Sequence, residues 1–183
     1  PENGALVKVD HEYTENYIWS TSLVWNILRD SQYTEAMLKT FEEASDGSGV
    51  LSNNHGKGTM SLVTRNDCAE SAVCVAAGAG EDNTIYDITG PERVSMEMFV
   101  TIGSEVTGKK VKYQFIDDDA MYRHWDSLGV PRTTDGDFAN ALLPFCSDDM
   151  VSYGRAIRLG QMNKQSNHVE LLTGSKPKSL KSV

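Results

Sequence analysis

The sequence of 183 residues is poor in basic side chains and contains no long apolar run. Lys and Arg number 17 against 26 Asp and Glu, which gives a net charge of −9 at pH 7. A nucleic-acid-binding surface needs clustered cations to displace counterions, so this balance argues against such a partner. No stretch approaches the roughly 20 apolar residues of a membrane span, and residues 1–4 do not resemble a signal peptide. We therefore expect neither nucleic acid nor a membrane among the partners.

Cysteine and histidine are scarce and scattered. The three cysteines, Cys68, Cys74 and Cys146, are odd in number and show no C-x-x-C spacing. This usage favours reduced thiols and a cytoplasmic protein. The four histidines form no H-x-x-x-H pair, so we expect no metal site.

Segments with the apolar pattern of a strand alternate along the chain with segments that have the apolar pattern of a helix. The run at 23–28 is nearly continuous, which favours a strand buried in a parallel sheet. A polar turn follows at 29–32. A helix comes next, with Tyr33, Met37 and Phe41 on one face. Strand, polar loop and helix in this order form half of a βαβ unit, so we predict an α/β fold.

The remaining elements follow the same alternation. Ser95 is a suitable N-cap and Gly108 a suitable C-terminal residue for one helix, and Asn66 or Asp67 caps the helix before it. We predict a glycine-rich loop at 45–58, further strands at 59–64, 83–89 and 111–116, and helices at 10–22, 66–77, 95–107, 117–128 and 134–150.

Five short motifs occur in order along most of the chain. They are H-E-Y-T-E at 11–15, N-I-L-R at 26–29 with Y-T-E at 33–35, T-R-N-D-C-A at 64–69, I-Y-D-I-T-G-P-E at 85–92, and L-T-G-S-K-P at 172–177. Together they resemble the motifs of the NmrA-like family of atypical short-chain reductases. That family includes quinone and triphenylmethane reductases and redox-sensing regulators.

The resemblance implies the C-terminal half of a Rossmann-like parallel sheet plus a small α/β substrate-binding lobe. Residues 1–78 would end the sheet and residues 79–183 would form the lobe. The family's phosphate-binding glycine motif is missing, because the glycine-dense segments at 47–58 and 78–80 lack its spacing behind an apolar strand. Half a sheet would leave a strand edge bare. We therefore expect another chain, a second polypeptide, to supply the N-terminal half and the phosphate-binding motif for NAD(P)H.

The resemblance also implies a subunit or fragment of an NAD(P)H-dependent oxidoreductase. Hydride would pass to an apolar conjugated carbonyl such as a quinone or enone. Two alternatives stay open: a dinucleotide-sensing regulatory subunit without catalysis, and a structural half of a heteromeric enzyme whose partner carries catalysis. No tyrosine has a lysine four residues later, so the Tyr-x-x-x-Lys chemistry of typical short-chain dehydrogenases is not expected.

Ligands of open α/β sheets bind at the carboxyl ends of the strands, and the turn after Leu28 occupies such a position. By the resemblance, this loop lies against the nicotinamide end of the cofactor. The candidate residues are His11, Arg29, Asp30, Ser31 and Gln32 for the cofactor, Asp30 and Tyr33 for catalysis, and Tyr33, Met37, Phe138 and Phe145 for the substrate.

Each candidate also has a plainer interpretation. Arg29 can pair with a carboxylate inside the fold, and Asp30 can be a solvated loop residue. His11 can serve a hydrogen bond near a helix start. Phe138 and Phe145, on the last predicted helix, can pack in the core.

Overall fold

The structure, a computed structural model, describes residues 4–136, 138 and 143–183. Its strands are β1 (Asn26–Asp30), β2 (Val50–Asn53), β3 (Thr59–Met60), β4 (Thr84–Ile88), β5 (Val94–Ser95) and β6 (Lys112–Phe115). Its helices are α1 (Lys8–Trp19), α2 (Thr34–Asp46), α3 (Arg65–Ala76), α4 (Met96–Thr107), α5 (Asp118–Ser127), α6 (Ser147–Arg158), α7 (His168–Thr173) and the short 3-10 helix η1 (Leu180–Ser182).

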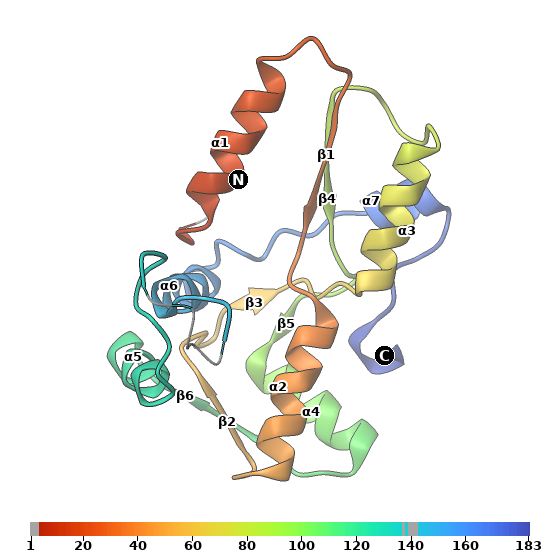
Figure 1. Cartoon of the computed structure of the whole chain (residues 1–183). Coiled ribbons are helices and arrows are strands. Elements are labelled where there is room, and N and C mark those ends of the chain that lie inside the picture. The colour runs from red at the N-terminus through yellow and green to blue at the C-terminus, as the bar shows by residue number, and fades with distance from the viewer. Residues whose placement is uncertain (1–3, 137, 139–142) are drawn as a thin grey trace.

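Strands β1 and β4 form a parallel pair in which Asn26 aligns with Thr84 and Asp30 with Ile88. Helix α1 lies on one face of this pair and α3 on the other (Figure 1). Because the strands are parallel, their carboxyl ends meet at the same edge. The predicted α/β fold is therefore confirmed. The predicted division of the chain after residue 78 would assign β1 to the sheet region and β4 to the substrate-binding lobe. This division stays a prediction.

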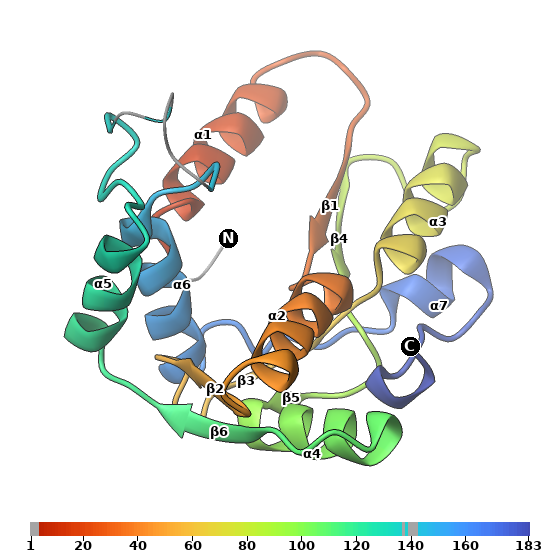
Figure 2. The same ribbon diagram turned by 60° about the horizontal axis from the view of Figure 1, so that its bottom comes forward.

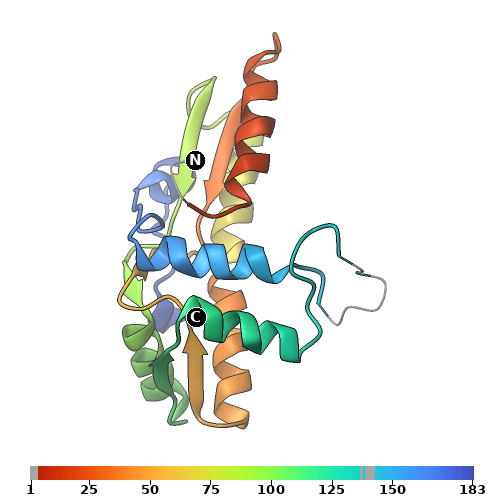
Figure 3. The same cartoon turned by 90° about the vertical axis from the view of Figure 1, so that its left-hand side faces the viewer.

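A second parallel pair, β2 and β6, lies at the far end of the molecule from β1 and β4, with α6 between the two pairs (Figure 3). Helices α5 and α6 run side by side next to it (Figure 2). The short strands β3 and β5 pair antiparallel near the middle. The chain thus builds a sheet end and a separate α/β lobe.

Two groups of buried side chains hold these layers together. In the larger one the rings of Phe41 on α2 and Phe99 on α4 meet edge to face, with centroids 6.1 Å apart. Its other members include Met37, Leu51, Met60, Val94, Met96, Val100, Val111 and Ile157. The smaller group joins β4 to α3 and α7 and consists of Val63, Cys68, Tyr86, Ile88, Val169 and Leu172. The site described below lies beside this smaller core.

Side chains, not a further strand, cover the edge of β4 that faces away from β1. The Asp87 N–H donates to His168 Nδ1 at 2.8 Å, and the Ser166 hydroxyl donates to the Asp87 carbonyl oxygen. Ser166 also donates its N–H to Thr89 Oγ1 at 3.0 Å. These bonds satisfy backbone groups that an edge strand would otherwise leave open. No described strand pairs with the other edge of β1.

Most predicted helix boundaries are confirmed. Ser95 caps α4, and Gly108 ends it in the left-handed conformation with φ of 72°. The predicted cap of α3 is wrong, because Thr64 is the N-cap and its side chain accepts from the Asp67 N–H. Asp67 was a plausible cap from its residue type alone, but it already belongs to the helix.

Five predicted segments need correction. Two of them are too long: the helix expected at 10–22 ends at Trp19, and the strand expected at 59–64 ends at Met60. The strand expected at 23–28 is β1 at 26–30, and Leu23 and Val24 are exposed. The loop expected at 45–58 contains β2, whose Leu51 is buried in the larger core. The helix expected at 134–150 is wrong for its described residues before 147, because α6 begins only there. Residues 137 and 139–142 of that prediction lie outside the described residues.

No helix among residues 4–136, 138 and 143–183 is long and apolar enough to cross a bilayer.

Replacing His168 with Ala should destabilise the fold by about 1–3 kcal/mol, because the Asp87 N–H in the strand then loses its acceptor. Urea unfolding followed by circular dichroism measures this change. His124→Ala, at an exposed position of α5, is the control and should change stability by less than about 0.5 kcal/mol. Equal effects of the two substitutions would contradict the role given to His168.

Candidate functional site

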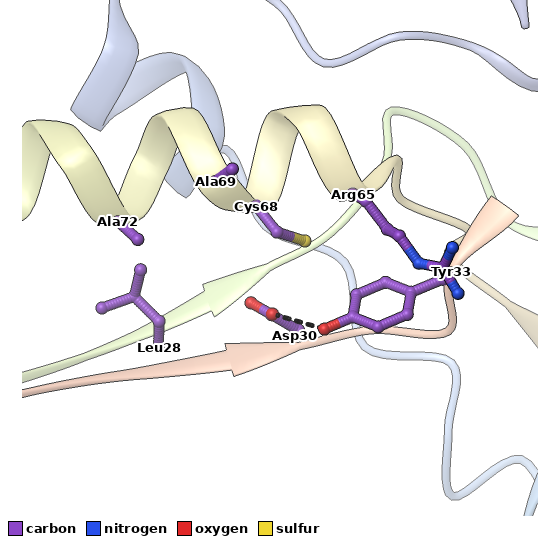
Figure 4. A pocket seen from close by; sticks show the side chains of 7 residues that line it. All are labelled: Leu28, Asp30, Tyr33, Arg65, Cys68, Ala69 and Ala72. Carbon is purple, nitrogen blue, oxygen red and sulfur yellow. Dashed lines mark hydrogen bonds between the residues drawn. The ribbon is translucent and has the colours of Figure 1, made fainter. Parts of the chain in front are cut away.

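A pocket of about 460 Å³ opens between β1 and the first turns of α3. Figure 4 shows the side chains that line it, with Asp30 and Tyr33 at one end and an apolar wall at the other. The lining residues are Leu28, Asp30, Tyr33, Arg65, Cys68, Ala69 and Ala72. The pocket thus begins at the carboxyl end of β1, where the sequence predicted the site.

The alternation of side chains along β1 decides which residues reach this pocket. Leu28 and Asp30 point toward α3, whereas Arg29 between them points to the α1 face. The loop that follows is fixed by a parallel bridge between Tyr33 and Val63. The Val63 N–H donates to the Gln32 carbonyl oxygen at 3.0 Å. Tyr33 is therefore held in extended backbone at the start of α2.

The other wall is one face of α3. Arg65, Cys68, Ala69 and Ala72 follow the i, i+3, i+4, i+7 spacing that places side chains on a single helix face. Glu35 on α2 fixes the start of this helix, because its carboxylate oxygens accept from the Arg65 N–H at 3.0 and 3.1 Å. A carboxylate in this place is also favoured by the helix dipole.

Asp30 and Tyr33 form the polar end of the pocket. The Tyr33 hydroxyl donates to Asp30 Oδ2 at 3.1 Å. Burial, with the charge of Asp30 and this hydrogen bond added to it, raises the pKa of Tyr33. The Arg65 guanidinium carbon lies 5.4 Å from the centre of the Tyr33 ring. The phenol is thus kept protonated, and it can donate a hydrogen bond at neutral pH.

The Cys68 thiol points toward this pair (Figure 4). Cys68 is 7% exposed. Burial first, and then the charge of Asp30, raise the pKa of Cys68 far above the ordinary range of thiols. The sulfur is therefore a neutral thiol.

An ion pair locks the opposite face of β1 to α1. Arg29 Nε and Nη2 donate to the two oxygens of Glu15 at 2.8 and 2.5 Å. Glu15 is buried, and the hydrogen bond from Arg29 lowers its pKa. The expectation that Arg29 pairs inside the fold is confirmed. The cofactor contact predicted for Arg29 stays a prediction.

The other predicted site residues lie apart from the pocket. His11 lies on α1, across the sheet from α3, and Ser31 and Gln32 form the turn at the carboxyl end of β1. Met37 is 5% exposed and packs in the larger core. Phe138 is half-buried, and Phe145 packs against Trp125 with ring centroids 5.4 Å apart. Of the nine candidates, the structure brings only Asp30 and Tyr33 into this pocket.

Reasoning from the sequence missed Arg65 and Cys68 as lining residues. The sequence presented Cys68 only as one of three scattered cysteines without C-x-x-C spacing. The helical spacing from Arg65 to Ala72 was the available signal, since it puts these side chains on one face. Which neighbour that face meets is decided by the chain path, which spacing does not give.

The described residues contain no group of three or more His, Cys, Asp or Glu side chains placed to hold a metal ion.

Known proteins with this architecture include reductases. The chain is 24% identical over 181 residues to the uncharacterized oxidoreductase YesF of Bacillus subtilis (strain 168). It superposes on the NADPH complex of an NADPH-dependent quinone oxidoreductase from Escherichia coli with a TM-score of 0.84 and 22% identity, covering 98% of this chain. The NADP(H) complex of Citrobacter sp. triphenylmethane reductase matches 97% of the chain with a TM-score of 0.77 and 26% identity. The fold is that of a Rossmann-like reductase.

The chain is shorter than these relatives. It spans 56% of the Bacillus protein and 59% of each of the two solved structures. The search against family models found no match.

Replacing Glu15 with Gln should destabilise the protein by roughly 2 kcal/mol at neutral pH, because Arg29 then loses its charged partner. The folded-state pKa of Glu15 lies below its ordinary value of 4.5, so the ion pair stabilises the fold fully above that pH. This stabilisation disappears as the pH falls through the lowered pKa.

Denaturant unfolding at neutral pH and at about pH 3 tests this dependence. The difference between the wild-type protein and Glu15→Gln should shrink in acid. Glu12→Gln, an exposed position of the same helix, is the matched control. A difference that stays constant with pH would show that the charge of Glu15 contributes nothing.

Proposed function

We propose that this chain is the substrate-side part of an NAD(P)H-dependent oxidoreductase that reduces an apolar conjugated carbonyl, such as a quinone or enone. The observation that carries the proposal is the Asp30–Tyr33 pair at the carboxyl end of a parallel strand, next to an apolar pocket wall. The match to NADPH-dependent and NADP(H)-bound reductases over nearly the whole chain supports it.

The pocket suits a flat, conjugated acceptor. Leu28, Ala69 and Ala72 form its apolar wall, and the Tyr33 ring lies at its polar end (Figure 4). Reduction of a carbonyl leaves negative charge on its oxygen. A protonated phenol can neutralise that charge by giving up its proton, which is the role we propose for Tyr33. Asp30 holds the hydroxyl in place.

The residues at this end of β1 fit the nicotinamide portion of a cofactor. Asp30 is exposed, and its carboxylate can accept hydrogen bonds from an amide such as the nicotinamide carboxamide. Ser31 and Gln32 follow in the same turn, and His11 and Arg29 complete the proposed cofactor contacts. When bound, NAD(P)H supplies the hydride. The turn from β1 to α2 contains no glycine that would let phosphates approach its backbone.

A second candidate is a dinucleotide-sensing subunit without catalysis. Asp30 favours it, because a carboxylate that accepts from Tyr33 also holds the phenolic hydrogen away from a substrate. Tight cofactor binding without turnover of any acceptor would support the sensor. A structural half of a heteromeric enzyme, with catalysis on the partner, would instead show turnover that does not depend on Tyr33.

We propose further that a dinucleotide-binding polypeptide segment docks along the free edge of β1 and carries the phosphate-binding motif. The Ser31 N–H donates to the Ile88 carbonyl oxygen, so alternate residues of β1 face β4. Leu28 and Asp30 therefore turn their backbone groups to the open edge. The far edge of the pair is already covered at Asp87 by His168 and Ser166. A parallel strand would satisfy the open groups.

A cytoplasmic location is part of the proposal. Cys68, Cys74 and Cys146 are all free thiols in the structure, which suits a reducing compartment.

Tyr33→Phe and Asp30→Asn should each lower kcat roughly a hundredfold, because each removes part of the proton-donating pair. The rate is read from the loss of NADPH absorbance with a panel of quinones and enones, using the natively purified protein that contains this chain. Tyr13→Phe, at an exposed position of α1, is the control. Both variants should fold normally, and a rate unchanged by Asp30→Asn would remove Asp30 from catalysis.

Hydrogen exchange tests the proposed docking edge. In the natively purified protein, the amides of Leu28 and Asp30 should be as protected as that of Arg29, which faces β4. In the isolated chain, we expect the two amides to exchange much faster than Arg29. Equal protection of the three in the isolated chain would mean that nothing docks at this edge.

A further inference from the structure

Asp30 has a second consequence for the pocket, which rests on the proposed function. We infer that the Asp30 carboxylate keeps Cys68 as an unreactive thiol, so that an electrophilic acceptor in the pocket is reduced and not captured by the sulfur. Quinones and enones react with thiolates by conjugate addition. A pocket that receives them beside a cysteine therefore needs a way to suppress the thiolate.

The geometry places the sulfur within the pocket. Cys68 lines the cavity from α3, and its side chain points toward Asp30 and Tyr33 (Figure 4). Only 7% of the residue is exposed to solvent. An acceptor bound against Leu28 and Ala69 would lie next to this sulfur, because all three residues line the same cavity.

The charges around the sulfur oppose its ionisation. Burial raises the pKa of Cys68, and three carboxylates add to the effect in the order Asp30, Asp67 and Glu35. Asp30 and Cys68 line the same pocket, and the charge of Asp30 opposes ionisation of the thiol. The charged and titratable groups that face this region come from β1, α2, α3 and the loop between β1 and α2: Asp30, Tyr33, Glu35, Arg65 and Asp67.

Arg65 is the cation that lines this pocket, but it interacts with Tyr33 and not with the Cys68 sulfur. Its guanidinium lies over the Tyr33 ring. Low-pKa cysteines owe their reactivity to an adjacent cation or helix N-terminus. Here the charge of Asp30 beside the sulfur is negative, and it opposes the ionisation that the start of α3 would otherwise favour.

The reaction that Asp30 suppresses is balanced without any further reagent. The thiolate sulfur forms a bond to a ring carbon of the quinone, and the π electrons move to the carbonyl oxygen. That oxygen takes up the proton that the thiol released. The proton on the sulfur-bearing ring carbon then moves to the second carbonyl oxygen, and the ring becomes a hydroquinone thioether. The sulfur supplies the two electrons that the ring gains. The product is a covalent adduct that blocks the pocket.

Alkylation of Cys68 by 1,4-naphthoquinone, without NAD(P)H, tests the inference. The natively purified protein is treated between about pH 6 and pH 9, and the adduct at each cysteine is quantified by peptide mass spectrometry. Cys68 in the wild-type protein should react slowly. In Asp30→Asn its reaction should be faster, since each unit of lowered pKa raises the thiolate fraction about tenfold at a given pH.

Matched variants separate charge from access. Asp30→Glu keeps the carboxylate and should react as slowly as the wild-type protein, and Tyr33→Phe removes only the phenol and should change little. Cys74, which lies on the same helix but does not line the pocket, is the internal reference. A charge effect raises the rate in Asp30→Asn but not in Asp30→Glu, whereas a pocket opened by disturbing this position raises the rate in both variants.

Equal alkylation rates of Cys68 in the wild-type protein and Asp30→Asn, with the variant folded by circular dichroism, would overturn the inference, because burial alone would then protect the sulfur. A rate raised as much in Asp30→Glu as in Asp30→Asn would overturn it as well. The measurement needs no turnover. Failure to reduce any quinone would therefore count against the proposed function. The effect of Asp30 on the alkylation rate of Cys68 could still be measured.

Discussion

The parallel pairing of β1 with β4 is the constraint on which the site depends. It brings the carboxyl ends of both strands to one edge, and it fixes which side chains of β1 turn to each face. Asp30 thereby reaches α3 and the pocket, while Arg29 reaches Glu15 on α1. One strand thus anchors a helix on one side and presents a carboxylate on the other. A shift of one residue in register would exchange these roles.

The position of Asp30 concentrates several effects on a single carboxylate. It accepts from the Tyr33 hydroxyl, it raises the pKa of Tyr33, and it raises the pKa of Cys68. A neutral residue at this position would leave both the phenol and the thiol easier to ionise. The identity of this one side chain therefore sets the chemistry of the pocket.

The sequence allowed prediction of the fold class and of the polar end of the site, because both follow from local patterns. Apolar periodicity located β4 and α4, and the strand-turn-helix order placed Asp30 and Tyr33 at a carboxyl end. It could not locate β2, since Leu51 is buried by partners distant in the chain. Cys68 was missed as a pocket residue for a similar reason. Its neighbour Asp30 is thirty-eight positions earlier, and only the folded chain brings them together.

The covered edge of β4 has a consequence for self-association. His168 and Ser166 occupy the hydrogen-bonding groups of Asp87, so a sheet built from this chain can lengthen in one direction only. Two molecules joined through their β1 edges would have, at this strand pair, only β4 edges covered at Asp87 with which to recruit a third. The β1–β4 pair therefore favours a single edge-to-edge junction over an open-ended series of them.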